Sequence, residues 1–159
     1  VDAVSDMEGV AVFNLYELSQ EIAFNIDEWS KIISDASAVI YQFPFYWMSA
    51  PSLLKKWQDE IFTFLSKTPA VAGKPLTVVT TTGSEYEAYR SGGRNRFTTD
   101  ELLRPYQVNA IHSGMSWQTP IVVYGMGTAD AGKNIAEGAN LYKQRVEMLI
   151  GNSNAGNNW

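Results

Sequence analysis

The sequence predicts an α/β fold, in which helices cover both faces of a doubly wound parallel sheet. Short runs of β-branched and aromatic residues alternate along the chain with longer amphipathic segments. One of these runs, at residues 38–45, is almost wholly apolar, as expected for a strand that is covered on both faces. No linker or internal repeat interrupts the alternation, and 159 residues suit one domain.

Four strands and the helices between them follow from this pattern. The strands are predicted at residues 10–16, 38–45, 76–82 and 119–125. Asn25, with Glu28 three residues later, has the pattern of a helix N-cap and capping box, and the helix that it opens would bury Trp29. Ser49 suits the N-cap of the next helix, because Pro51 would then fall in its first turn.

The second half of the chain continues the alternation after a polar loop at residues 83–96. Thr98 or Thr99 is expected to cap a helix that runs to about residue 113, and a last long helix is expected at residues 129–150. Residues 1–150 would form the single domain, and residues 151–159 a flexible tail. In a doubly wound sheet, ligands bind outside the carboxyl ends of the strands. The loops that follow residues 45, 82 and 125 are therefore the candidate sites.

Composition excludes several classes of protein. The net charge is −5 and no basic cluster is present, which argues against a nucleic-acid partner. The absence of cysteine rules out thiolate metal sites and cysteine nucleophiles, and the presence of a single histidine, His112, argues against a histidine metal site. No run approaches the roughly 20 apolar residues of a membrane span, so we expect a cytoplasmic protein without membrane insertion.

Three stretches carry a resemblance to a known family. They are QFPFYWMSAP at residues 42–51, TTTG at residues 80–83 with Tyr89 six residues later, and DELLRPY at residues 100–106 followed by GMSW at 114–117. In this combination and order the chain resembles the flavodoxin-like NAD(P)H:quinone oxidoreductases, including their bacterial branch of potassium-efflux ancillary proteins and stress-associated reductases.

The resemblance implies a fold and an activity. The fold would be a flavodoxin-like sheet with strand order 2-1-3-4-5. The activity would be reduction of quinones or similar two-electron acceptors, with FMN or FAD as cofactor and NADPH or NADH as hydride donor. It also implies a homodimer, with Trp57, Phe62 or Phe64 near the contact. A flavin is flat and apolar with one polar edge, so its site needs aromatic walls and a few fixed donors.

The resemblance also implies the residues of the site. The cofactor-binding residues would be Pro44, Phe45, Tyr46, Trp47, Met48, Thr81, Thr82, Gly83, Ser84 and Tyr89. Amides near Gly83 and Ser84 would face the pyrimidine carbonyl of the flavin, where negative charge gathers after hydride transfer. Taken alone, the aromatic residues of the first stretch could equally belong to a core or an interface, and TTTG could be an ordinary turn at a strand end.

Tyr89 and Asn95 are the predicted catalytic residues. By resemblance, the hydroxyl of Tyr89 would bond the reduced flavin, although a partly buried loop tyrosine is the simpler interpretation. Asn95 stands where animal members of the family have a histidine, and its amide can donate a hydrogen bond but cannot take up a proton. His112 is expected to be an ordinary helical residue.

The match breaks at the start of the chain. The family's first strand and its phosphate-binding loop have no counterpart in this sequence. Residues 1–9 resemble the end of the family's first helix, which follows that loop. We therefore expect the first strand to be missing from this sequence, together with its helix. Two other functions remain open. One is a regulatory subunit that docks on a potassium-efflux transporter, and the other is a structural domain that binds no flavin.

Overall fold

The computed structural model describes residues 1–18 and 23–154. Its elements in chain order are α1 (Leu15–Leu18), α2 (Ile26–Asp35), β1 (Val39–Pro44), α3 (Ser52–Trp57), the short π-helix η1 (Gln58–Phe62), α4 (Thr63–Leu65), β2 (Pro75–Thr81), the short 3₁₀-helix η2 (Tyr86–Tyr89), α5 (Thr99–Leu102), α6 (Arg104–His112), β3 (Ser116–Trp117), β4 (Ile121–Val123) and α7 (Ala131–Asn154). None of the helices within these two ranges is long and apolar enough to cross a membrane.

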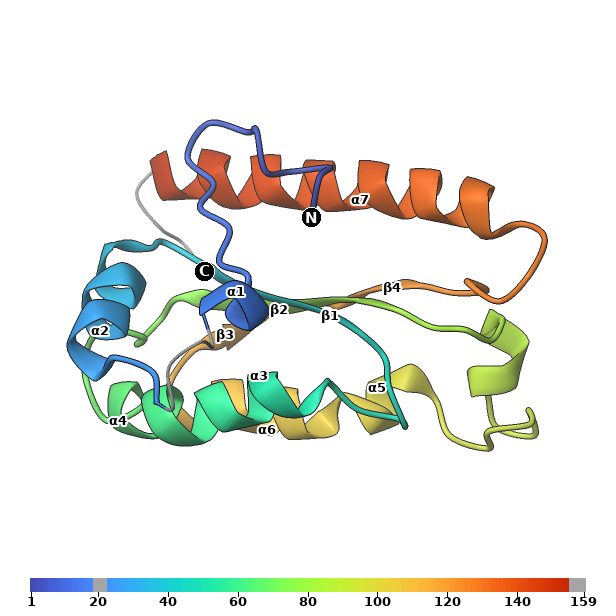
Figure 1. Ribbon diagram of the computed structural model, residues 1–159, viewed down its shortest axis with the longest axis horizontal. Coiled ribbons are helices and arrows are strands. Elements are labelled where there is room, and N and C mark those ends of the chain that lie inside the picture. The colour runs from blue at the N-terminus through green and yellow to red at the C-terminus, as the bar shows by residue number, and fades with distance from the viewer. Residues whose placement is uncertain (19–22, 155–159) are drawn as a thin grey trace.

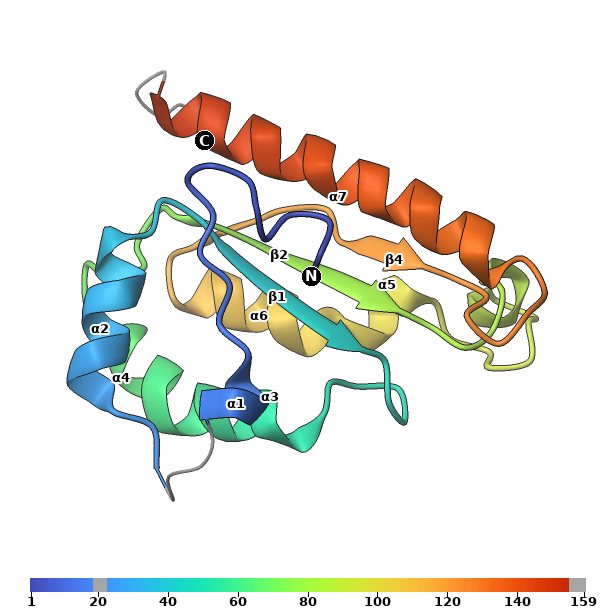
Figure 2. The ribbon, with the colours of Figure 1, turned by 45° about the horizontal axis from the view of Figure 1, so that its top comes forward.

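The sheet is parallel and centred on β2. On one side β1 pairs with β2 over its whole length, from Val39 opposite Leu76 to Pro44 opposite Thr81. On the other side β3 and β4 pair with successive parts of β2, so they act as two halves of one interrupted strand. The arrowheads of β1, β2 and β4 are directed to the same end of the sheet (Figure 2).

Helices lie on both faces of the sheet, as the sequence predicts. The long helix α7 and the N-terminal segment cover one face, while α3, α4 and α6 cover the other (Figure 1). The larger core lies under α3 and α6 and is rich in aromatic residues. The smaller core lies between α7 and the sheet, where Val4 packs with Val79, Ile121, Tyr142 and Val146.

The predicted strand at residues 10–16 is wrong. Residues 10–14 form neither strand nor helix, and Leu15 begins the short helix α1. In the order 2-1-3-4-5, a strand in this place pairs only with the first strand of the fold. No strand within the described residues pairs with the outer edge of β1, so this segment has no ladder to join.

The remaining strands differ from the prediction in their surroundings. One face of β1 is covered along the strand, with Tyr41 and Phe43 buried. The opposite face is covered only at Ile40, which packs against the smaller core, whereas Gln42 and Pro44 are exposed. The last strand breaks before Ile121, because Pro120 has no amide hydrogen to donate to a ladder.

The predicted N-caps are correct in two places and wrong in one. The Asn25 side chain accepts the amides of Asp27 and Glu28, which confirms the N-cap, but the Glu28 side chain does not accept the Asn25 amide, so the predicted capping box is not formed. Thr98 forms a full capping box with Glu101. Ser49 does not cap the helix after β1, which begins at Ser52 with Pro51 as its N-cap.

Two predicted helix boundaries also moved. The helix predicted from residue 98 to about 113 divides at Leu103, because Pro105 cannot donate the usual hydrogen bond to residue 101. Helix α7 extends to Asn154, four residues into the expected tail, and residues 155–159 lie outside the described part of the chain.

Gly138 lets α7 rest directly on β4. A Cβ added at this position would lie 2.2 Å from Cγ2 of Val123. We predict that Gly138→Ala lowers the free energy of unfolding by about 1–3 kcal/mol, since the helix must move off the sheet. Gly132→Ala in the same helix meets open space and is the matched control. It should raise stability by about 0.5 kcal/mol through helix propensity. Urea unfolding of both variants checks the pair, and equal effects would contradict it.

Candidate functional site at the carboxyl ends of the strands

The loops that follow β1, β2 and β4 meet at one end of the sheet. The amide of Phe45, just past β1, donates to the carbonyl of Thr81 at 2.9 Å. The amide of Thr82, just past β2, donates to the carbonyl of Val123 at 2.9 Å. These bonds continue the ladder to its last residue, so the aromatic turn and the TTTG segment leave the sheet side by side (Figure 2).

The turn after β1 presents its aromatic residues to solvent. The Tyr46 amide donates to the Ser49 carbonyl at 2.8 Å, and the Ser49 amide donates to the Tyr46 carbonyl at 3.0 Å. The two residues between them, Trp47 and Met48, have φ angles of 48° and 63°. Non-glycine residues rarely adopt such angles, and strained backbone of this kind is concentrated at functional sites. Trp47 is 99% exposed, whereas Phe45 behind it is half-buried.

Tyr106 of α6 fixes the base of this turn. Its hydroxyl accepts the amide of Ala50 at 3.1 Å and lies 3.3 Å from the hydroxyl oxygen of Ser49. The Tyr106 ring is buried against Phe43, with 5.3 Å between the ring centroids. Two of the stretches that carry the family resemblance are thus in direct contact.

Tyr106→Phe should therefore loosen the aromatic turn. The ring packing is kept, but the Ala50 amide loses its acceptor, which should cost about 1–2 kcal/mol of unfolding free energy in chemical denaturation. Tyr142→Phe is the control, because Tyr142 is equally buried and its hydroxyl forms no hydrogen bond within the described residues. A loss of stability in the control as large as that in Tyr106→Phe would remove the basis of this prediction.

The loop after β2 is held by three successive carbonyl groups. Those of Thr82, Gly83 and Ser84 accept the amides of Met126, Gly127 and Gly125, each at 2.9 Å. The Thr82 hydroxyl also donates to the Ser84 carbonyl at 2.8 Å. Thr82 is buried, so its side chain shapes the loop and does not reach outward.

These bonds dictate where the amides of the same loop point. In a trans peptide the N–H is antiparallel to the preceding carbonyl, and the described chain has no cis peptide. The amides of Gly83, Ser84 and Glu85 therefore all point away from residues 125–127. None of the three donates to an acceptor within the described residues. We call these three amides the donor triplet. Successive amides aimed to one side form a site for an anion or a carbonyl oxygen.

Tyr89 and Asn95 stand next to this loop. The Tyr89 ring is buried between Phe45, at 6.2 Å, and Tyr124, at 5.9 Å between centroids. The Asn95 amide donates to the Ala88 carbonyl at 2.9 Å, which ties the residue to η2. Its side-chain nitrogen Nδ2 is buried and has no hydrogen-bond partner within the described residues. A buried donor without an acceptor is costly, and such groups in native proteins often await a ligand.

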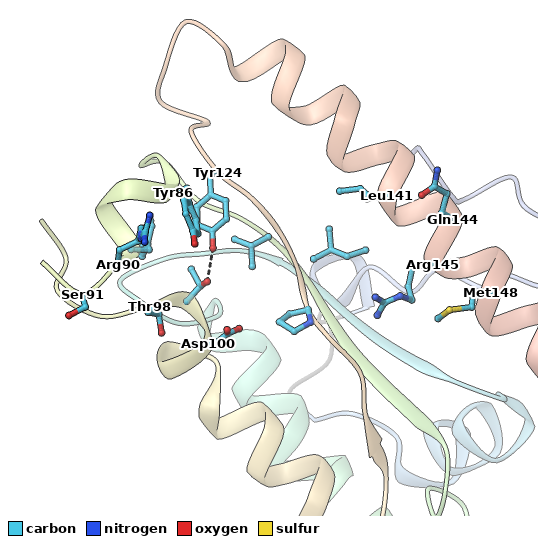
Figure 3. Close-up of a pocket in the computed structure, with 15 residues that line it drawn as sticks. Tyr86, Arg90, Ser91, Thr98, Asp100, Tyr124, Leu141, Gln144, Arg145 and Met148 are labelled. Atoms are coloured by element: carbon cyan, nitrogen blue, oxygen red, sulfur yellow. Dashed lines mark hydrogen bonds between the residues drawn. The ribbon is translucent and has the colours of Figure 1, made fainter. Parts of the chain in front are cut away.

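A hollow of about 820 Å³, which Tyr89 also lines, lies along the outer edge of β4 (Figure 3). Leu141, Arg145 and Met148 approach it from α7, and Tyr86 and Arg90 approach it from the opposite side. Its floor includes Tyr124, whose hydroxyl lies 2.6 Å from the Thr99 hydroxyl oxygen, and burial raises the pKa of the Tyr124 phenol. The donor triplet does not line this hollow.

The structure brings most of the predicted site residues to one place. The turn residues Pro44 to Met48, the loop residues Thr81 to Ser84, Tyr89 and Asn95 all lie at the carboxyl ends of β1 and β2. Two further residues were not foreseen. The sequence indicates Tyr106 only as part of a stretch that resembles the family, and Arg94 only as part of a polar loop.

Comparison with known proteins identifies relatives of the chain. A family model described as a flavodoxin-like fold matches residues 1–146. An uncharacterised NAD(P)H oxidoreductase of Bacillus subtilis is 32% identical over 93% of the chain and 77% of its own length. A glutathione-regulated potassium-efflux system ancillary protein of Serratia proteamaculans is 35% identical over 74% of the chain and 67% of its own length.

A solved structure points to the same fold. The general stress protein 14 of Treponema denticola, crystallised in complex with FMN, matches with a TM-score of 0.83 and 26% identity. The match covers 93% of this chain and 87% of the other.

Proposed function

Because the chain belongs to the family with the flavodoxin-like fold, we propose that it binds FMN at the carboxyl ends of β1 and β2. With FMN bound it would transfer hydride from NAD(P)H to quinones or similar two-electron acceptors. The observation that carries the proposal is the donor triplet of Gly83, Ser84 and Glu85 beside an exposed aromatic turn.

The residues present fit a flavin on two independent grounds. The donor triplet and Asn95 Nδ2 are donors without acceptors, and a flavin offers carbonyl oxygens and ring nitrogens along one edge. Gly83 adds no side chain in front of these amides, since a Cβ at this position would meet only open space. Bound flavin supplies hydride chemistry that no amino-acid side chain can perform.

The chain's own residues would bind the flavin, orient it and stabilise the charge of its reduced form. Phe45 and Trp47 would form the apolar wall of the site, with the turn held in place by Tyr106. The donor triplet would face the edge on which negative charge develops, and because three other hydrogen bonds already fix the loop, its amides need no rearrangement. Tyr89, packed on Phe45, would place its hydroxyl near the same edge.

A homodimer, as implied by the family resemblance, is part of this proposal. Trp57 and Phe62 are each 3% exposed and belong to the protomer core, so of the three aromatics considered only Phe64, at 55% exposed, is available to a partner.

The direct test adds FMN to the pure protein, removes the free flavin, and follows NADPH oxidation with a benzoquinone as acceptor. Retention of FMN and acceptor-dependent oxidation are expected. A protein that retains no flavin and shows no turnover would refute the proposal.

The similarity to a potassium-efflux ancillary protein supports a second candidate function, that of a transporter subunit. Affinity purification from the native host distinguishes the two. Recovery of a potassium-efflux transporter with the chain would favour the second function, and recovery of the chain alone would reject it.

A further inference from the structure

Arg94 is the only cationic side chain within the described residues that bonds to a side chain of Gly83–Glu85, the residues whose amides form the donor triplet. Its guanidinium donates to the Ser84 hydroxyl. Arg94 is exposed and forms no ion pair with a carboxylate of the described residues. The chain carries a net charge of −5, so an unpaired cation at this place is not a consequence of a basic surface.

The backbone holds Arg94 in this position. The neighbouring Gly93 fits against η2 so closely that a Cβ would lie 2.2 Å from the Glu87 carbonyl oxygen. The Gly93 amide donates to the Arg90 carbonyl at 2.9 Å, and the Arg96 amide donates back to the Gly93 carbonyl at 3.0 Å. Arg94 therefore lies in a compact turn, and the residues before and after it, Gly93 and Asn95, both contact η2.

The charge of Arg94 is permanent. An arginine side chain carries its positive charge in proteins at all ordinary pH values. Asn95, the next residue, offers a buried N–H donor but no titratable group. Arg94 and Asn95 can thus supply a fixed positive charge and a fixed dipole beside the donor triplet, and neither of the two side chains supplies a proton.

We propose that Arg94 is a positioning and charge-compensating residue for the reduced flavin. This inference rests on the proposed FMN site. It assigns to one residue the compensation of the negative charge on the reduced flavin. Hydride transfer from NAD(P)H delivers two electrons and one proton, leaves NAD(P)⁺, and adds one unit of negative charge to the accepting ring. Arg94 would balance that charge through the Ser84 loop, so the reduced state should bind more tightly than the oxidised state.

The reduction potential of bound FMN measures this difference without any turnover. We expect Arg94→Gln to weaken binding of reduced FMN about tenfold relative to oxidised FMN, which lowers the potential by about 30 mV for a two-electron couple. Arg94→Lys keeps the charge and should restore most of the potential. Arg90→Gln is the matched control, because it removes the same charge from the same segment, where Arg90 lies over the Tyr86 ring at 5.3 Å. Its potential should equal that of the unsubstituted protein.

Spectroelectrochemical titration of the four proteins, with FMN affinity measured in parallel, gives separable outcomes. An unchanged potential in Arg94→Gln with normal FMN affinity would overturn the role of Arg94 and leave the proposed function intact. Equal potentials in Arg94→Gln and Arg94→Lys would also overturn it, because charge would not be the cause. Failure of the unsubstituted protein to bind FMN would overturn the proposed function, and this inference with it.

Discussion

Gly83→Val should abolish FMN binding while leaving the fold intact. A Cβ at Gly83 meets no atom within 4 Å, so the protein has room for the new side chain. Residues 125–127, which bond to the carbonyls of the loop, are not among the neighbours of this Cβ, so the room lies outside that contact. A valine there would stand between the donor triplet and its ligand. We expect FMN affinity to fall at least about 100-fold, or about 2.7 kcal/mol.

Thermal unfolding and a fluorescence titration with FMN check this result together. Gly151→Ala is the control, because it also adds a side chain to open space but lies in the last turn of α7, at the opposite end of this helix from the loops. Its FMN affinity should equal that of the unsubstituted protein. If Gly83→Val bound FMN normally, the donor triplet would not be the flavin contact.

Gly93→Ala should disturb both stability and binding. The added Cβ would lie 2.2 Å from the Glu87 carbonyl oxygen and 2.8 Å from that of Ala88, and backbone atoms cannot yield as a flexible side chain can. The loop would have to leave η2, which breaks the bond from the Asn95 amide to Ala88. We expect a loss of about 2–3 kcal/mol in unfolding free energy and at least about a tenfold loss of FMN affinity.

Gly92→Ala is the control for this substitution. Gly92 has a φ angle of 86° but open space around its Cα, so alanine there meets backbone strain without a collision. It should cost about 1 kcal/mol and leave FMN affinity unchanged. If the two variants weakened FMN binding equally, the close fit of Gly93 on η2 would not be what positions the loop.

The hydrophobic pattern predicted a strand correctly where the segment has a neighbouring strand of this chain to pair with. The runs at residues 38–45 and 76–82 became β1 and β2, because each supplies the other's ladder. Residues 10–16 are also mostly apolar but form no strand, since strand formation depends on a neighbour that the local sequence does not describe. The prediction that both faces of β1 are covered was wrong in part for the same reason, because coverage depends on neighbouring segments that the local sequence does not describe.

The candidate site was predictable in place but not in detail. The ends of β1 and β2 follow from the strand pattern and the rule for doubly wound sheets, so the meeting of the aromatic turn with TTTG could be foreseen. The contacts of Tyr106 with Ala50 and of Arg94 with Ser84 span 56 and 10 residues, and no periodicity encodes them. The outward direction of the donor triplet depends on hydrogen bonds from residues 125–127, and the strand pattern does not encode these bonds.

The most direct test of the central claim is a ¹⁵N-resolved NMR titration of the protein with FMN. If the donor triplet binds the polar edge of the flavin, the amide resonances of Gly83, Ser84 and Glu85 should show the largest shifts, accompanied by the Asn95 side-chain amide. Binding that left these resonances in place, and instead moved those of Val122 and Tyr124 in the hollow beside β4, would contradict the account.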